Sequence, residues 1–161
     1  MHNAGLLATA LMMIVAAFVL VPAGGFAQDE AAAVDRLLGQ IRSEPSGNAR
    51  SEMAKDLAVF LTDLPDSVRA QAIDEGRIDA IASLLNDEND SVRFWAAGAL
   101  GKIGPTATRA VPALKEAHAK IVATRRLEGP VILGIDSSVA IVVALERITG
   151  EEPKCPYALM C

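Results

Sequence analysis

The sequence has few of the residues on which catalysis and metal binding usually depend. Its 161 residues include two cysteines, two histidines, one tryptophan and one tyrosine. His118 is the only histidine after residue 27, and no serine or cysteine motif accompanies it. One histidine and two cysteines fall short of the four ligands of a structural zinc site. We therefore expect no catalytic residues, no metal and no other cofactor.

Blocks of positive charge are also missing. The chain carries 20 acidic and 15 basic residues, a formal net charge of −5. Nucleic-acid surfaces need clustered lysine and arginine to displace counterions from phosphates, and the nearest candidate is the isolated pair Arg125–Arg126. The few aromatic residues do not suffice for a platform on which bases could stack. Composition thus argues against a nucleic-acid partner.

A single long apolar run stands at the N-terminus, over Gly5–Val21. A proline and two glycines follow it, and the small residues Gly25 and Ala27 precede the polar "QDE". This pattern predicts a signal peptide over residues 1–27, cleaved after Ala27 on export to the periplasm or the medium. No lysine or arginine precedes the run, and its length would span a bilayer. An uncleaved membrane anchor is therefore the alternative.

Beyond residue 27 the apolar residues recur at helical spacing, and no segment alternates with a period of two. This predicts an all-α fold, with one domain over residues 28–150 and a tail over residues 151–161. The predicted helices cover roughly residues 29–42, 53–64, 66–75, 78–85, 90–103, 107–124 and 136–149, and the 66–75 helix is expected to end at Gly76.

The chain also contains an internal repeat. "DLPDSVRAQA" at 63–72 and "DENDSVRFWA" at 87–96 share the pattern D-x-x-D-S-V-R-x-x-A. The segment "LLNDENDSVRFWAAGALGKIGPTATRAVPALKEA", residues 84–117, resembles a HEAT repeat of the bacterial type found in bilin-lyase-like proteins. "AIDEGRIDAIASLL", residues 72–85, is similar to the armadillo relative of that repeat. The resemblance implies a short right-handed α-solenoid of about three units and roughly seven helices.

Within such a repeat, acidic and arginine residues take structural roles. We expect Asp63 with Arg69, and Asp87 with Arg93, to bridge a turn to the next helix, one unit after another. In the last unit Ser137–Ser138 replace the Val–Arg pair. The ladder of Asp–Arg pairs is therefore expected to stop there, as in an atypical capping repeat.

The helix predicted over 90–103 supplies the candidates for partner contact, which are Phe94, Trp95 and Lys102. Neighbouring helical residues point about 100° apart, so they cannot all share the core face of Val92 and Ala96. We expect Phe94 and Lys102 to face the groove or solvent, and Trp95 to border the core.

The ends and the glycines of the same helix carry further expectations. Asp90 or Ser91 is predicted to cap its N-terminus, and Gly104 to end it. Gly98 in the helix interior costs up to about 1 kcal/mol relative to alanine, which predicts a close helix crossing there. A phosphate loop would need a preceding strand and a following Lys-Ser/Thr, and both are missing.

Cys155 and Cys161, the only cysteines, both follow the last predicted helix. In an exported chain they are expected to form a disulfide. Free or intermolecular thiols are the alternatives. A thiol-redox pair more often has C-x-x-C at a helix N-terminus, which differs from this spacing.

The resemblance implies a scaffold, adaptor or accessory subunit without catalytic activity, and the predicted signal peptide adds that it is exported. It would bind another protein in the groove lined by the second helix of each unit. Two alternatives from other classes are a membrane-tethered regulatory solenoid with an uncleaved N-terminal helix, and a thiol-redox protein using Cys155 and Cys161.

Overall fold

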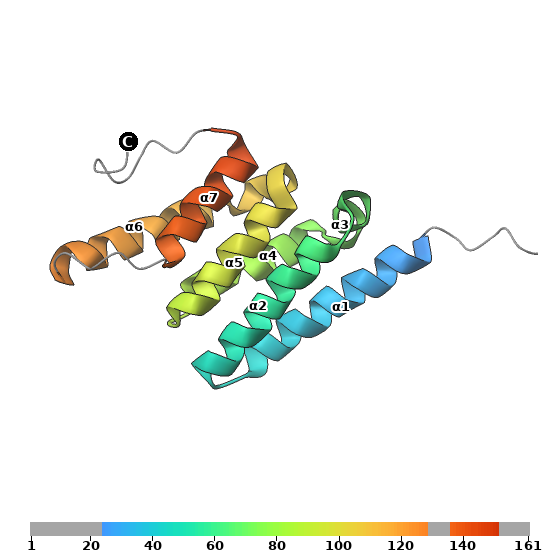
Figure 1. The fold of residues 1–161 in the computed structure, drawn as a ribbon, viewed down its shortest axis with the longest axis horizontal. Helices are drawn as coiled ribbons and strands as arrows, with labels where there is room; N and C mark the ends of the chain where they lie inside the picture. Colours follow the sequence, from blue (N-terminus) through green and yellow to red (C-terminus); the bar gives the residue numbers. More distant parts are fainter. Residues whose placement is uncertain (1–23, 129–135, 152–161) are drawn as a thin grey trace, which may run out of the picture.

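The computed structural model describes residues 24–128 and 136–151, and these ranges are all-α, as predicted (Figure 1). The predicted signal run and both cysteines lie outside the described residues. The elements, including the 3-10 segments η2 and η3, are α1 (Gly24–Ser43), α2 (Gly47–Asp63), α3 (Asp66–Ala72), α4 (Glu75–Ser83), η2 (Leu84–Asn86), α5 (Asp90–Ile103), η3 (Gly104–Ala110), α6 (Val111–Glu128) and α7 (Ser137–Thr149).

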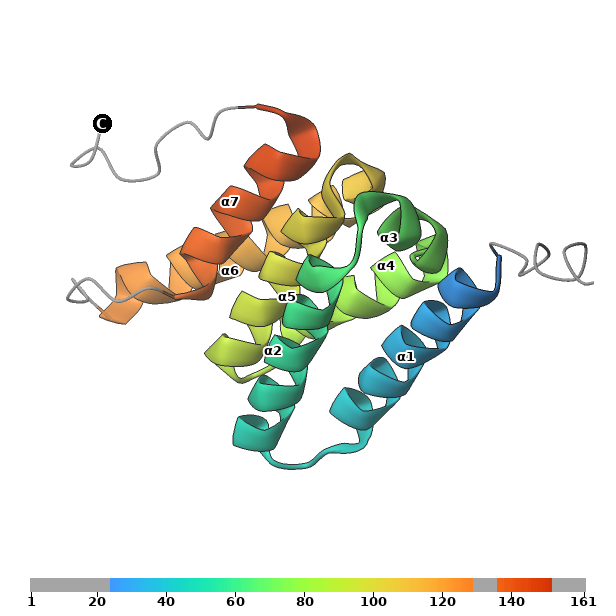
Figure 2. The same ribbon diagram turned by 45° about the vertical axis from the view of Figure 1, so that its right-hand side comes forward.

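Three helices, α2, α5 and α7, lie side by side and form one layer of the molecule (Figures 1 and 2). The second layer consists of α1, then α3 and α4, then η3 and α6. In it α1 packs on α2, α4 on α5, η3 on α5 and α7, and α6 on α7, while α3 packs on α1. The most extensive packing is that of α5 against α2 on one side and α7 on the other. Because α2 packs on α5 as α5 packs on α7, the pair α1–α2 is the first unit of the stack.

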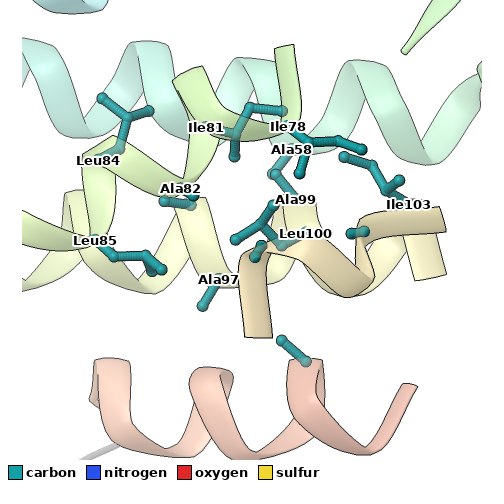
Figure 3. Packing of buried hydrophobic residues seen from close by; sticks show 14 of the residues in the cluster. Ala58, Ile78, Ile81, Ala82, Leu84, Leu85, Ala97, Ala99, Leu100 and Ile103 are labelled. Carbon is teal, nitrogen blue, oxygen red and sulfur yellow. The ribbon is translucent and has the colours of Figure 1, made fainter. Parts of the chain in front are cut away.

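One continuous apolar core joins the two layers. Figure 3 shows Ile78 and Ile81 of α4 together with Ala99 and Leu100 of α5 among the residues of this core. The central helix α5 is buried on several sides, since it touches a neighbour in its own layer on each flank and the second layer behind. Its buried residues are accordingly small as well as large, and they are Val92, Ala96, Ala97, Ala99, Leu100, Gly101 and Ile103.

Ion pairs connect successive units in the second layer. Arg77 of α4 makes two hydrogen bonds to the carboxylate of Asp35 in α1, at 2.9 and 2.6 Å. Arg109 of η3 bonds the Asp79 carboxylate of α4 in the same two-pronged way, at 2.8 and 2.9 Å. This geometry fixes the orientation of the two groups, because a planar guanidinium matches a planar carboxylate.

The close helix crossing lies at Gly101, and the prediction that it lies at Gly98 is wrong. A Cβ atom built at Gly101 would lie 3.1 Å from the Cα and 3.4 Å from the Cβ of Ala144 in α7. A Cβ atom at Gly98 would meet nothing within 4 Å. Gly101 therefore allows α5 and α7 to approach, whereas Gly98 faces open space.

Several predicted helix ends also differ from the structure. The N-cap of α5 is Asn89, whose side-chain oxygen accepts the backbone N–H of Ser91 at 2.9 Å, rather than Asp90 or Ser91. Gly76 lies in the first turn of α4, which Asp74 caps, and does not end the preceding helix. The side chains of asparagine and aspartate serve equally well as caps, so the sequence did not single out the one used.

These two glycines should respond to substitution in opposite ways. Gly98→Ala should raise the free energy of unfolding by about 0.5–1 kcal/mol, because alanine is favoured in a helix and its methyl group has room. Gly101→Val should lower it by about 1–3 kcal/mol, because the added atoms overlap α7. Urea unfolding of both variants measures this, and equal effects at the two positions would contradict the packing described.

Candidate functional site

A hollow of about 300 Å³ opens on the face formed by α2, α5 and α7. We call it the groove, and its lining is Ala58, Val59, Thr62, Phe94, Trp95, Ala97, Gly98, Gly101, Lys102, Val139, Ala140, Val143, Ala144 and Arg147. The large hydrophobic residues that are exposed in the described part of the chain, Val59, Val139 and Val143, all line it, with 46, 41 and 37% of their surface accessible. The groove therefore gathers the exposed large hydrophobic side chains of the described residues.

The groove is deep along α5 because this central helix has small residues there. Ala97, Gly98 and Gly101 of α5 contribute little or no side chain, and a Cβ atom at Gly98 would have no neighbour within 4 Å. The valines of α2 and α7 stand on either side. Gly98 thus deepens the groove, which is the role that the structure gives it in place of a helix crossing.

An aromatic pair forms part of the lining. The rings of Phe94 and Trp95 meet edge to face, with their centroids 5.1 Å apart and an angle of 89° between their planes. Both residues are half-buried, and Trp95 packs against the core. The edge-to-face arrangement holds the two rings in a defined orientation.

The polar groups of the lining are few. The hydroxyl of Thr62 donates to the carbonyl of Ala58 within its own helix, at 2.8 Å. Lys102 and Arg147 are the only charged residues of the lining, and both are exposed cations. Neither belongs to any ion pair among the described residues. The structure therefore places the predicted candidates Phe94, Trp95 and Lys102 in one groove, while sequence reasoning missed Arg147 and the three valines.

The arginines predicted in structural pairs do bridge a turn to the next helix, through the backbone. Arg93 donates from Nη1 to the carbonyls of Asp87 and Glu88, at 2.7 and 3.0 Å. Arg69 bonds the carbonyls of Leu61 and Leu64 in the same manner, at 2.7 and 2.6 Å. Each arginine is the fourth residue after the N-cap of its helix, so its side chain reaches back over the preceding turn.

The carboxylates paired with these arginines differ from the predicted ones. Arg69 pairs with Asp66 at 2.9 Å and Arg93 with Asp90 at 2.7 Å, in each case one turn back on the same helix. The predicted pairs Asp63–Arg69 and Asp87–Arg93 are therefore wrong. Each arginine pairs instead with the aspartate three residues before it, because residues three apart on a helix lie next to each other. Asp63 is exposed at the end of α2.

Asp87 instead connects two units. Its carboxylate accepts two hydrogen bonds from Arg50 of α2, at 2.9 and 3.1 Å, and both side chains are largely shielded from solvent. Arg50 is also the fourth residue after an N-cap, and it bonds the carbonyls of Glu44 and Pro45. The first unit, which shares little sequence pattern with the others, therefore repeats their geometry.

In the last unit a serine makes the corresponding link. Ser137, fully buried at the start of α7, donates from its hydroxyl to Asp90 Oδ1 at 2.6 Å and from its backbone N–H to Oδ2 at 3.2 Å. Partial burial raises the pKa of the Asp90 carboxyl, but the bonds from Ser137 and the nearby Arg93 outweigh it, so the pKa lies below its ordinary value.

A second hollow of about 520 Å³ lies beside the turn between η2 and α5. Its charged groups already have partners, since Asp87 binds Arg50, Asp90 binds Arg93 and Ser137, and Lys120 binds Glu116. Within residues 24–128 and 136–151, no three side chains of metal-binding type come together. In the same ranges no helix has the length and the apolar composition that a membrane span requires.

Comparison with known families matches residues 34–128, more than half of the chain, to the family described as HEAT repeats. The chain belongs to the HEAT-repeat family. The match begins within α1, so it includes the first unit, for which the sequence alone offered only helical spacing. HEAT repeats commonly mediate contacts between proteins, and the fold is typically non-catalytic. No curated protein and no solved structure matches the chain significantly.

The contact between Ser137 and Asp90 should make stability depend on pH. Ser137→Ala should lower the free energy of unfolding at pH 7 by about 1 kcal/mol, a modest value because the carboxylate stays partly solvated. Since the pKa of Asp90 is lower in the folded than in the unfolded chain, this stabilisation is present above about pH 4 and is lost as the pH falls through the folded pKa.

Urea unfolding of the wild type and Ser137→Ala at several pH values measures this difference. Ser91→Ala, an exposed serine on the same turn as Asp90, is the matched control. A loss of stability in Ser137→Ala that stays constant down to pH 3 would show that the charge of Asp90 plays no part.

Proposed function

We propose that this HEAT-repeat protein is an exported adaptor or accessory subunit, which holds a segment of another protein in the groove between α2, α5 and α7. The observation that carries the proposal is the position of Val59, Val139 and Val143, the exposed large hydrophobic residues of the described chain, around one hollow. Apolar patches rimmed by polar residues mark sites of protein contact on otherwise polar surfaces.

The chemistry of the lining favours binding over catalysis. It holds no acid, histidine or cysteine, and its threonine hydroxyl is bonded to its own helix. General acid–base catalysis needs a group that can exchange a proton near the working pH. The lining offers instead apolar contact area, a fixed aromatic pair and two cations.

The energy available suits a segment rather than a large partner. Fully burying a valine side chain contributes about 1.5 kcal/mol or more, and roughly two-fifths of each valine remains to be covered. Each valine would then add roughly 0.5–1 kcal/mol on binding. The half-buried Phe94 and Trp95 would contribute further, since aromatic residues in pockets often dominate interface energies.

The export part of the proposal rests on the apolar run, which lies outside the described residues. N-terminal sequencing of the protein from its native source tests it. A chain that begins at Gln28 supports export with cleavage, and a chain that retains residues 1–27 favours the membrane-tethered alternative instead. The disulfide between Cys155 and Cys161 remains a prediction of the sequence.

A charge placed in the groove, or the loss of an aromatic side chain there, should weaken partner binding without unfolding the protein. We expect Val143→Asp and Phe94→Ala to reduce the yield of a cross-linked partner about tenfold, because a buried charge or a lost aromatic contact costs 1.4 kcal/mol or more. Ala123→Asp adds the same charge at an exposed site on α6 and is the control.

The measurement is cross-linking of the tagged protein in its native compartment, followed by quantification of what co-purifies. Circular dichroism verifies that each variant is folded. If no stoichiometric partner is found, or if one is retained equally by Val143→Asp and Ala123→Asp, the groove is not the binding site.

A further inference from the structure

The charge of the groove narrows down what it binds. We infer that the groove takes a protein segment with a short apolar stripe followed at one end by an aspartate or glutamate, whose carboxylate lies against Lys102 and Arg147. This inference rests on the proposed function and names the chemistry of its partner.

The first support is the contrast between the groove and the rest of the protein. The chain has more acidic than basic residues, yet the lining has two cations and no acid. Arginines that serve the fold have carboxylate partners, and these are Arg50, Arg69, Arg77, Arg93 and Arg109. Lys102 and Arg147 have none among the described residues. The exposed Arg36, Arg42 and Lys115 have none either, but Lys102 and Arg147 line the groove and are therefore available to its partner.

The second support is the order of groups along the groove. Lys102 stands in the last turn of α5 and Arg147 in the last turn of α7. These two helices run in the same direction (Figure 1), so both cations lie at one end of the groove. The Arg147 side chain passes above Gly101, since its Cδ lies 3.6 Å from a Cβ built there. Phe94, at the start of the second turn of α5, and Val139, in the first turn of α7, lie towards the opposite end of these helices and mark the apolar end.

Positive residues in the last turn of a helix also interact favourably with its dipole. That effect accounts for a cation at the end of α5 or α7, but it does not require apolar surface beside it. The neighbouring valines, and the lack of an acidic residue in the lining, point to a partner segment whose apolar residues are followed by an acidic one.

The size of the groove sets the length of the segment. From Phe94 to Lys102 the helix rises by about 12 Å, which corresponds to roughly two turns of a bound helix or about four extended residues. A segment of this length presents two or three apolar side chains to the groove and one carboxylate beyond them.

A fatty acid shares this order of groups, but the groove is too open for it. Sites for small ligands bury about 70–90% or more of the ligand, whereas the valines beside this groove are 37–46% exposed to solvent. An acyl chain would keep one side in water. A segment of a protein brings its own covering surface, so the observations favour a protein.

Selection from a displayed library of random peptides on the immobilised protein tests the inference. We expect the enriched peptides to combine apolar residues with an aspartate or glutamate at a fixed spacing. On Lys102→Glu/Arg147→Glu the acid should be replaced by lysine or arginine, and peptides from the first selection should bind about tenfold more weakly. Lys115→Glu/Arg36→Glu, which reverses two exposed cations outside the groove, should enrich the same acidic peptides as the wild type.

Trp95 reports occupancy directly, because it is the only tryptophan of the chain and lines the groove. Selected peptides without tryptophan should shift its emission on titration, and Val143→Asp should abolish the shift. Lys102→Gln/Arg147→Gln keeps the apolar lining. It should lower the affinity for acidic peptides without raising the affinity for basic ones. Circular dichroism verifies the fold of each variant.

Three outcomes would overturn the inference. The first is that the enriched peptides depend on Val143 for binding but carry no acid, or bind the charge-reversed variant equally well. This would show that the groove does not recognise a carboxylate, and it would leave the proposed function intact. If no enriched peptide depends on Val143, the inference and the proposed peptide groove fail together. If oleate shifts the emission of Trp95 while no peptide does, the ligand is a lipid.

Discussion

The structure depends on the close approach of α5 to its neighbours, and above all on its contact with α7 at Gly101. A Cβ atom there would lie 3.1 Å from the Cα of Ala144, so a side chain would force α7 to move away by a few tenths of an ångström. The alanines of α5 serve the same end, since small residues let helix axes come close. This choice of residues has a second consequence. The small residues of α5 lie between two helices that carry valines, and this leaves a groove. The packing that stabilises the stack therefore also shapes its proposed binding surface.

The second constraint is the connection at the beginning of each second helix. Arg50 and Arg93 reach back to backbone carbonyls of the preceding turn, and Asp87 and Asp90 join one unit to the next. Carbonyl groups in a turn need partners when water has little access, and arginine can serve several at once because it has five N–H donors in a fixed fork. These bonds fix the ends of α2, α5 and α7 relative to one another. The groove is therefore bounded by helices that are held at their ends as well as along their packed faces.

The sequence predicted the fold well because helical spacing and the repeated D-x-x-D-S-V-R pattern report on local geometry. It placed α5 within its bounds and Phe94, Trp95 and Lys102 on the surface that became the groove. It could not pair Asp87 with Arg50, because the two residues come from different units whose relative position depends on packing. The roles of Gly98 and Gly101 were likewise out of reach, since both are glycines in one helix and differ only in what the neighbouring helix places opposite them. Arg147 was missed because its unit lacks the repeated pattern.

In the groove, affinity and selectivity come from different residues. The apolar lining supplies affinity, and the two cations supply selectivity, which suits a short segment. Its apolar lining can supply binding energy to any hydrophobic side chain of the right size, so the lining alone discriminates little. Charges at the rim of an interface influence which partner binds and how fast it arrives more than how tightly it is held. Lys102 and Arg147 stand at such a rim, on a protein whose net charge is otherwise negative. A segment without an acid would have to approach an acidic protein with nothing to orient it. A segment that carries one near its apolar residues would be directed to the groove, where its carboxylate meets two cations that have no ion-pair partner among the described residues.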